Sequence, residues 1–528
     1  MRPTRTLLSS LVLAPMAGAV AAQCPVETFE ASAPKSSDQF GDALSVWGDT
    51  LVVGKPRFVP GGLDGDAAHV FERTQAGWVE SQILSSPDAV QGEWFGDAVA
   101  LVGDTILVGD PGWNSQRGKA YLYERNAGVW SNTGSLLAGG GGIGELFGAT
   151  TAISDDGQWA AVTALNKGNG HVYVYENNAG TWTQKHAFTT NTSSSPIGFG
   201  VSLDFEGEWL AVGDWHSNVN GLESGSVYLY REQGGSWTLQ QRIEPGDGAA
   251  DDNFGIDVSL EGDRLLVGAC GDDNDSGSAY LYELVGGSWI QVDKIFSEQR
   301  APFELFAISV HLEGGRALLG ETGPPFTSGR AALFDLAGSN LNLAETIEPQ
   351  GASSDAFFGV TVEIEDGELF VGADNDIVGG SFTHGAVRTY ATQGMAMLAS
   401  ADALSVTSGG QVNYRLVTCP PEPGDTFLML GSLSGTTPGY PVSSLILPLV
   451  VDPYTFFTLG SANVPPYVSS LGPILAGGEG TASFVLPPNA PSSLVGITIY
   501  HAAALIELTP TLLAVIQVTP ARTLDFTP

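Results

Sequence analysis

An internal repeat runs through most of this chain. The dipeptide Phe-Gly marks six copies and a degenerate Phe-Ala marks the seventh: Phe40-Gly41, Phe95-Gly96, Phe147-Gly148, Phe199-Gly200, Phe254-Gly255, Phe306-Ala307 and Phe358-Gly359. Successive copies lie 55, 52, 52, 55, 52 and 52 residues apart. A repeat of this length and regularity indicates one structural unit, copied and stacked against its neighbours.

Each copy is predicted to contain four strands. In the first copy, Ala43–Val46 and Thr50–Val53 alternate as strands do, and Gly48-Asp49 between them suits a hairpin turn with positive φ. A Tyr-rich run such as Tyr121–Tyr123 follows as the third strand, and a run opened by Trp, such as Trp130, follows as the fourth. A four-stranded sheet of this size cannot bury both of its faces alone. Radial stacking of seven such sheets covers those faces, which predicts an all-β, seven-bladed β-propeller.

The ring is expected to close through the N-terminal segment. The seventh copy stops after Val387–Tyr390, and no Trp-led run follows it. Val26–Phe29 precedes the first Phe-Gly much as Val79–Gln82 precedes the second. We therefore expect this segment to supply the missing fourth strand, which also hides a sheet edge that would otherwise invite aggregation. The propeller is predicted to span residues 23–394.

These residues resemble the FG-GAP repeat of the integrin α-subunit propeller and of many bacterial secreted proteins. The resemblance covers residues 25–392 and rests on the Phe-Gly, Val-Gly and Tyr-x-Tyr positions, with Gly54-Lys55-Pro56 as a version of the Gly-Ala-Pro element. It implies an extracellular propeller. Calcium loops between the first two strands of integrin blades are not expected here, because two or three residues are too few to surround a cation.

The two ends of the chain have a different character. Residues 1–22 read as a secretory signal, with Arg2 and Arg5 before an apolar stretch and small residues near Ala21. Residues 395–528 lack Trp and consist of short apolar runs separated by turn residues, which predicts a C-terminal β-sandwich. No later segment is apolar and long enough to be a membrane span. Three cysteines allow at most one bridge; Cys24 with Cys419 and free thiols both remain open.

Charge and motifs narrow the classes of function. The net charge of −37 leaves no basic patch for nucleic acid or an anionic membrane surface. The chain also lacks the HExxH, GxSxG, P-loop and CxxC patterns. A pair of carboxylates for glycoside hydrolysis could still assemble across blades without leaving a motif.

Candidate binding residues lie in the connections between second and third strands, which are long and varied, whereas the first-to-second and third-to-fourth connections are short. Binding residues concentrate on such loops. The aromatic candidates for a protein or glycan ligand are Trp113, Trp215, His216, Phe326 and Phe382. The alternative is that these side chains pack against their own loops.

A second candidate is a calcium site. Asp272, Asp273 and Asp275 offer hard oxygen ligands for Ca²⁺ in one short loop. The alternative is a solvated acidic turn. No other cofactor is indicated.

These features together predict a secreted or cell-surface protein that acts without catalysis. We expect a monomer that recognises or adheres to an extracellular protein or glycan through its long-loop face. Two other hypotheses remain: a polysaccharide-acting hydrolase or lyase, and a structural component of an envelope or matrix.

Overall fold

The computed structural model describes residues 25–391, except 33, 35–37, 57–65, 75–76, 89–92, 193–197, 325–326, 350–355 and 377–383, and beyond them the backbone of strands between 394 and 527. The predicted signal, residues 1–22, and Cys24 lie outside the described residues. Cys270 is a buried free thiol, and burial raises its pKa to about 12.

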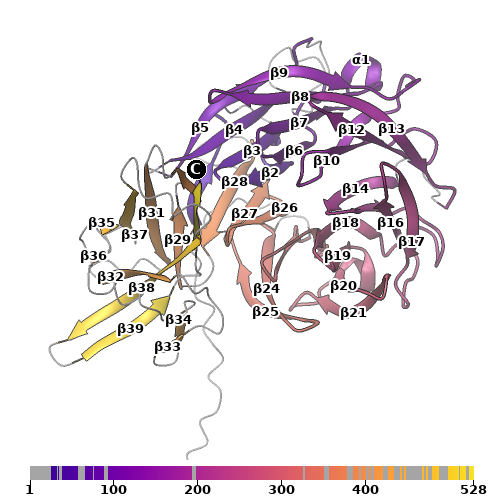
Figure 1. Ribbon diagram of the computed structural model, residues 1–528. Helices are drawn as coiled ribbons and strands as arrows, with labels where there is room; N and C mark the ends of the chain where they lie inside the picture. Colours follow the sequence, from indigo (N-terminus) through magenta and orange to yellow (C-terminus); the bar gives the residue numbers. More distant parts are fainter. Residues whose placement is uncertain are drawn as a thin grey trace, which may run out of the picture.

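Seven four-stranded antiparallel sheets follow one another around a common centre, in chain order (Figure 1). The first three blades are β2 (Leu44–Trp47), β3 (Thr50–Lys55), β4 (Ala67–Thr74) and β5 (Gly77–Leu84); β6 (Val99–Val102), β7 (Thr105–Asp110), β8 (Lys119–Asn126) and β9 (Val129–Leu136); and β10 (Phe147–Ile153), β11 (Trp159–Ala164), β12 (His171–Asn178) and β13 (Thr181–Thr189). In each of these blades the first strand is innermost.

The next three blades repeat this order. They are β14 (Phe199–Glu206), β15 (Trp209–Asp214), β16 (Ser226–Glu232) and β17 (Trp237–Ile243); β18 (Phe254–Glu261), β19 (Arg264–Ala269), β20 (Ser278–Val285) and β21 (Ser288–Phe296); and β22 (Phe306–Glu313), β23 (Arg316–Glu321), β24 (Arg330–Ala337) and β25 (Asn340–Ile347). The predicted glycine turns join the first two strands, with φ of 55° at Gly48 and 56° at Gly262.

The seventh blade closes the ring as predicted. It combines β26 (Phe358–Glu365), β27 (Glu368–Ala373) and β28 (Ala386–Ala391) with the N-terminal strand β1 (Pro25–Phe29), in the order β1-β28-β27-β26. β1 runs antiparallel to β28, with Phe29 opposite Val387. The two ends of the propeller are therefore held in one hydrogen-bonded sheet.

The core lies between the blades. The seven repeat phenylalanines are at most 1% exposed. In the cluster between the fourth and fifth blades, Phe254 packs with Trp209, Tyr280 and Trp289. Its ring meets that of Tyr280 edge-on, with centroids 5.3 Å apart. The repeated Tyr and Trp positions therefore serve packing between blades.

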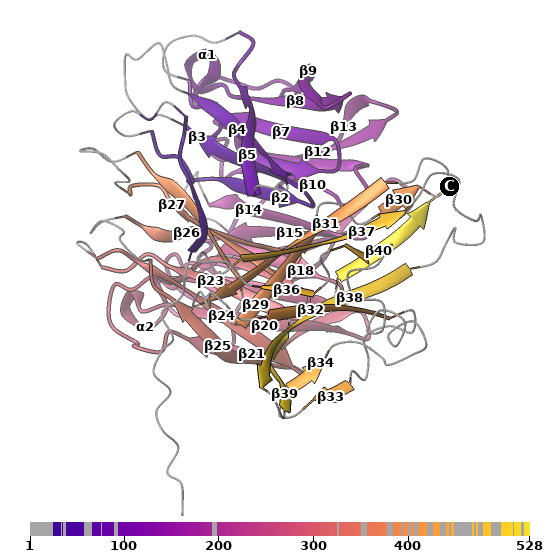
Figure 2. The same cartoon turned by 90° about the vertical axis from the view of Figure 1, so that its left-hand side faces the viewer.

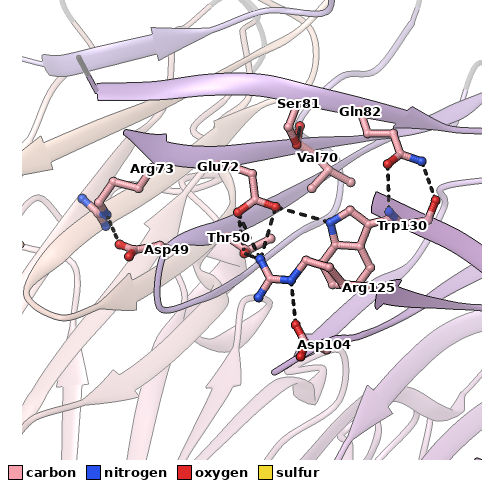
Figure 3. Close-up of polar contacts among 10 residues, drawn as sticks. All are labelled: Asp49, Thr50, Val70, Glu72, Arg73, Ser81, Gln82, Asp104, Arg125 and Trp130. Atoms are coloured by element: carbon pink, nitrogen blue, oxygen red, sulfur yellow. Dashed lines mark hydrogen bonds and ion pairs between the residues drawn. The ribbon is translucent and has the colours of Figure 1, made fainter. Parts of the chain in front are cut away.

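Polar contacts join the outer strands of neighbouring blades. The side-chain amide of Gln82 in β5 makes two hydrogen bonds with the backbone of Trp130 in β9. It accepts one from the Trp130 N–H at 2.9 Å and donates one to the Trp130 carbonyl at 2.6 Å. Below this contact Arg125 lies between two carboxylates, with Glu72 at 3.2 Å and Asp104 at 2.6 Å (Figure 3). Gln241 and Trp289 repeat the amide contact 159 residues later.

The first residues of the chain take part in the same pattern. Glu27 in β1 accepts from the Trp78 N–H at 3.0 Å, as Gln82 does from Trp130. The closing strand therefore makes the same contact with the first blade that β5 and β17 make with the blades after them.

Beyond residue 393 the structure describes backbone strands only. They are β29 (Gly394–Ala399), β30 (Ala403–Ser405), β31 (Gly410–Cys419), β32 (Thr426–Ser432), β33 (Tyr440–Val442), β34 (Leu445–Leu447), β35 (Tyr467–Val468), β36 (Leu471–Pro473), β37 (Glu479–Leu486), β38 (Thr498–Thr509), β39 (Leu512–Val518) and β40 (Arg522–Thr527). One sheet pairs β29-β31-β37-β35, and another contains β30, β40, β38, β32, β36 and β39. The β-sandwich and its boundary at residue 395 stay predictions. Across the described part of the chain, no helix has the length and apolar character needed to cross a membrane.

Candidate functional site on the long-loop face

Two single helical turns mark the long-loop face, which comprises the connections between second and third strands and those between blades. α1 (Trp113–Gln116) and α2 (Asp272–Asp275) lie in the second-to-third connections of the second and fifth blades. Figure 2 shows both turns on the same side of the ring. Their inner residues have left-handed backbone angles, with φ of 49° at Asn114 and 54° at Asp273. Asn and Asp tolerate this geometry singly, but each turn has three consecutive residues with positive φ, which is unfavourable, so surrounding contacts must hold it.

Three of the predicted aromatic residues lie in the described part of the chain and make contacts within their own blades. Trp113 lies beneath the Lys119 ammonium, which is 4.6 Å from its ring centroid. Trp215 stacks on His216 with centroids 4.2 Å apart, and burial lowers the pKa of His216. Phe326 and Phe382 lie outside the described residues. For Trp215 and His216 the packing alternative therefore accounts for what is observed, whereas ligand binding by all five stays a prediction.

One of the three predicted calcium ligands pairs with an internal cation. Asp272 lies 2.6 Å from the Lys294 ammonium and accepts a hydrogen bond from the Tyr280 hydroxyl at 3.0 Å. Asp273 is exposed. Among the described residues no group of three or more His, Cys, Asp or Glu could hold a metal ion. Calcium binding by Asp272, Asp273 and Asp275 stays a prediction that metal titration can test.

A buried acidic residue two positions before the repeat phenylalanine escaped the sequence analysis. It is present in five of the seven units: Asp38, Glu93, Glu145, Asp252 and Glu304. Four of these side chains are at most 4% exposed, and Glu145 is half-buried. The regular spacing was a signal that could have identified them. They form a partial ring of carboxylates beneath the long-loop face.

Three of these carboxylates have a basic partner in the same blade. Lys55 lies 3.5 Å from Asp38, Lys167 lies 2.9 Å from Glu145, and Arg330 lies 3.1 Å from Glu304. Basic partners offset the large cost of burying a carboxylate.

The second blade is arranged differently. Burial, followed by the charge of Glu93, raises the pKa of Asp110 to about 8. Lys119, which occupies the strand position of Arg330, bonds instead to Asp88 at 2.8 Å. The second blade therefore keeps two neighbouring acids where the sixth blade keeps acids around a guanidinium.

A cavity of about 400 Å³ opens in front of that guanidinium in the sixth blade. Its lining includes Glu304, Glu321 and Arg330, with Gln299 and Glu348 beside them. Arg330 Nη2 contacts both Glu304 and Glu321, whose side chains are each 5% exposed. This arrangement holds charged donors and acceptors rigidly next to open space, which suits recognition of a polar ligand.

A comparison with family models found the FG-GAP repeat at residues 78–123 and 237–282. Each match starts at the Trp of an outer strand and ends in the third strand of the following blade. The sequence repeat is thus displaced by one strand from the blade, which explains why the N-terminal strand must complete the last sheet. The propeller is of the FG-GAP type.

Comparison with solved structures gave several chains similar to this one. A protein from Lactobacillus plantarum is 14% identical, with coverage of 65% of this chain and 99% of the other and a TM-score of 0.44. Hydrazine synthase of Kuenenia stuttgartiensis is 11% identical (66% and 98% covered, TM-score 0.44). The propeller domain of the Trilobed protease of Pyrococcus furiosus is 7% identical (66% and 94% covered, TM-score 0.39). Comparison with curated proteins found no match.

Three further acids gather where the channel of the FG-GAP propeller meets the long-loop face. Burial raises the pKa of Asp42 to about 6. Burial and then the charge of Asp42 raise the pKa of Asp97 to about 8 and that of Asp374 to about 7. Each carboxyl is disfavoured in its charged form because it is removed from water close to another acid.

We expect the FG-GAP propeller to become less stable as pH rises from 5.5 to 8.5. The pKa of each of these acids is higher in the folded state than the unfolded value of 3.8. Their stabilisation is therefore complete below about pH 4 and is lost as pH rises through 6 to 8. Melting temperature should fall by several degrees across this range.

The variant Asp97→Asn should reduce that fall, because the amide does not ionise. Asp263→Asn, on an exposed hairpin, should leave the pH profile unchanged. Equal slopes for wild type and Asp97→Asn would contradict the assignment.

Proposed function

We propose that this FG-GAP propeller is an exported, non-enzymatic protein for extracellular recognition or adhesion, and that its long-loop face binds a protein or a glycan. The observation that carries the proposal is the contrast between a uniform scaffold and one varied face. All seven units bury the same repeat phenylalanine, whereas the connections on the long-loop face differ from blade to blade. A rigid support with variable loops is the usual design of binding proteins.

The cavity in the sixth blade favours a polar ligand such as a glycan. Glu304, Glu321 and Arg330 hold one another in place, so a ligand meets groups that lose little conformational freedom on binding. Sugar hydroxyls both donate and accept hydrogen bonds, which matches a lining of carboxylates, an amide and a guanidinium.

The N-terminal and C-terminal segments fit the same proposal. Residues 1–22 would direct export, and residues 395–528, proposed to form a β-sandwich, would serve attachment or packing. The mature protein is proposed to act as a secreted or cell-surface monomer.

Binding should be detected when the purified mature chain is applied to glycan and extracellular-protein arrays. We expect a ligand with a micromolar or lower dissociation constant. Glu348→Lys, at the exposed rim of the sixth-blade cavity, should weaken binding about tenfold, which corresponds to 1.4 kcal/mol. It leaves the buried acids and Arg330 intact.

The matched charge reversal Asp263→Lys, on an exposed hairpin of the opposite face, should bind as the wild type does. Absence of any ligand at micromolar concentrations would count against recognition. Release of the protein from cells on removal of residues 395–528 would favour a structural component instead.

A polysaccharide-acting hydrolase or lyase is the second candidate, because one pair of acids at the ring axis has the required character. Burial raises the pKa of Asp155 to about 6, and the charge of Glu206 and a hydrogen bond to it add to the effect. A carboxyl group with a raised pKa beside a second acid is a candidate general acid for such enzymes. Cleavage of a polysaccharide panel, abolished by Asp155→Asn, would establish this alternative.

A further inference from the structure

A second cavity lies at the end of the channel opposite the long-loop face. About 460 Å³ of space is enclosed there by the innermost strands of all seven blades. Its lining carries seven carboxylates: Asp155, Asp204, Glu206, Glu261, Glu313, Glu363 and Glu365. Neither lysine nor arginine is present among its described lining residues. We call it the axial pocket.

Much of this polar lining joins neighbouring blades. The side chain five positions after the repeat phenylalanine accepts a hydrogen bond from a backbone N–H of the next blade. These bonds are Leu260 N–H to Asp204 at 2.7 Å, Leu312 N–H to Ser259 at 2.9 Å, Ile364 N–H to His311 Nδ1 at 3.0 Å, Val46 N–H to Glu363 at 2.9 Å and Leu101 N–H to Ser45 at 3.1 Å. They satisfy backbone donors at the inner edge of five of the seven sheets, where no further strand is available to pair with.

This series of hydrogen bonds between neighbouring blades lacks an accepting side chain in the second and third blades. Ala100 and Ala152 occupy the accepting position there, and a methyl group accepts no hydrogen bond. Both residues line the axial pocket. The second blade lines the pocket with apolar residues only, 99–102, whereas the carboxylates come from the third to seventh blades. The pocket therefore has an apolar side and an acidic side.

Two buried oxygens in the pocket have no partner. Thr151 is 8% exposed, and its hydroxyl makes no hydrogen bond within the described structure. The other six units carry Leu or Val at this position: Leu44, Val99, Leu203, Val258, Val310 and Val362. Glu261 Oε2 is also buried without a partner. Buried polar atoms are rarely left unpaired, so these two point to a missing donor.

We infer that the axial pocket binds an organic cation through its ammonium or guanidinium group, either a free amine or the side chain of a lysine or arginine in a partner. Such a group supplies both positive charge and several N–H donors, which this lining lacks. A bare metal ion fits less well, because no three acidic or histidine ligands among the described residues gather around one point. The inference concerns the opposite face and does not depend on the proposed recognition function.

The test is titration calorimetry of the full mature chain with agmatine, spermidine and a short arginine-containing peptide. We expect saturable binding of at least one of these probes. Thr151→Val, which restores the apolar residue of the other units, and Glu261→Gln should each weaken binding about tenfold. The control Asp335→Asn changes an exposed acid that lines neither cavity and should have no effect.

The two sources of the cation are distinguished by the probes. Binding of free agmatine or spermidine supports a small-molecule site, and binding of the peptide alone supports a partner's side chain. Absence of saturable binding up to millimolar concentrations would overturn the inference. Equal affinity of the wild type, Thr151→Val and Glu261→Gln would also overturn it, provided that circular dichroism shows all three proteins folded.

Discussion

Replacing Gly109 with alanine is expected to prevent the ring from assembling or to lower its stability by about 3 kcal/mol or more. A Cβ atom on Gly109 in β7 would lie 1.9 Å from the carbonyl oxygen of Gly148 in β10. Both groups belong to strand backbone, with β7 inside its sheet and β10 at the inner edge of the next, so neither can move aside without disturbing strand pairing. The steric conflict must therefore separate the second and third blades.

The same close approach recurs between five other pairs of neighbouring blades. A Cβ on Gly54, Gly213, Gly268, Gly320 or Gly372 would lie 1.8–2.2 Å from a carbonyl oxygen of the following blade. This explains physically why the apolar run of the second strand ends in glycine in these units. At these contacts the backbones of two neighbouring blades meet without a side chain between them, which glycine permits.

Thermal unfolding and soluble yield measure the effect. Gly134→Ala is the matched control, because Gly134 lies in strand β9 and a Cβ there would meet nothing within 4 Å. Its melting temperature should stay close to that of the wild type. Normal stability of Gly109→Ala would show that the blades are less tightly apposed than described here.

Phe29→Ala is expected to lower the free energy of unfolding by about 3–5 kcal/mol, the usual range for a buried phenylalanine. Phe29 is 5% exposed and meets Phe71 edge-on at 5.2 Å and Trp78 at 6.5 Å. It fastens the closing strand β1 to the first blade. Its loss weakens the one sheet that contains both ends of the propeller.

Denaturant unfolding and limited proteolysis test this prediction together. Thr28→Ala, on the exposed side of the same strand, keeps the pairing with β28 and should change stability by less than about 1 kcal/mol. Faster cleavage within the first and seventh blades is expected for Phe29→Ala only. Indistinguishable behaviour of the two variants would mean that β1 contributes little to closure.

The propeller could be predicted from the sequence because the patterns that indicate its strands and turns are local and recur in each unit. Thr50–Val53 was predicted as a strand and forms part of β3. Gly48 and Gly262 lie in the predicted hairpin turns and have the positive φ that such turns require. The missing fourth strand of the last unit also predicted the closing role of Val26–Phe29. Each of these features depends on residues close together in the chain, or on the count of units.

The candidate site was only partly accessible from the sequence. Ligand binding by Trp215 and calcium binding by Asp272 depend on which side chains surround these residues, and the sequence does not show those neighbours. In the structure Trp215 stacks on His216, and Asp272 pairs with Lys294 from another strand. Asp38, Glu93, Glu145, Asp252 and Glu304 were detectable from their spacing, but their burial and their partners were not.

Two lysines show which features the sequence determines and which only the tertiary structure decides. Lys119 and Lys294 each place an ammonium 4.7 Å from the ring of the third-strand tyrosine of their blade, Tyr121 and Tyr280. The first lysine comes from the third strand and the second from the fourth. The order of residues alone determined the unit, its strands and the number of blades, because hydrogen bonding and burial within a blade follow local pattern. Only folding decided which charges meet, because neighbouring strands lie about 4.8 Å apart and a long side chain reaches the same point from either one.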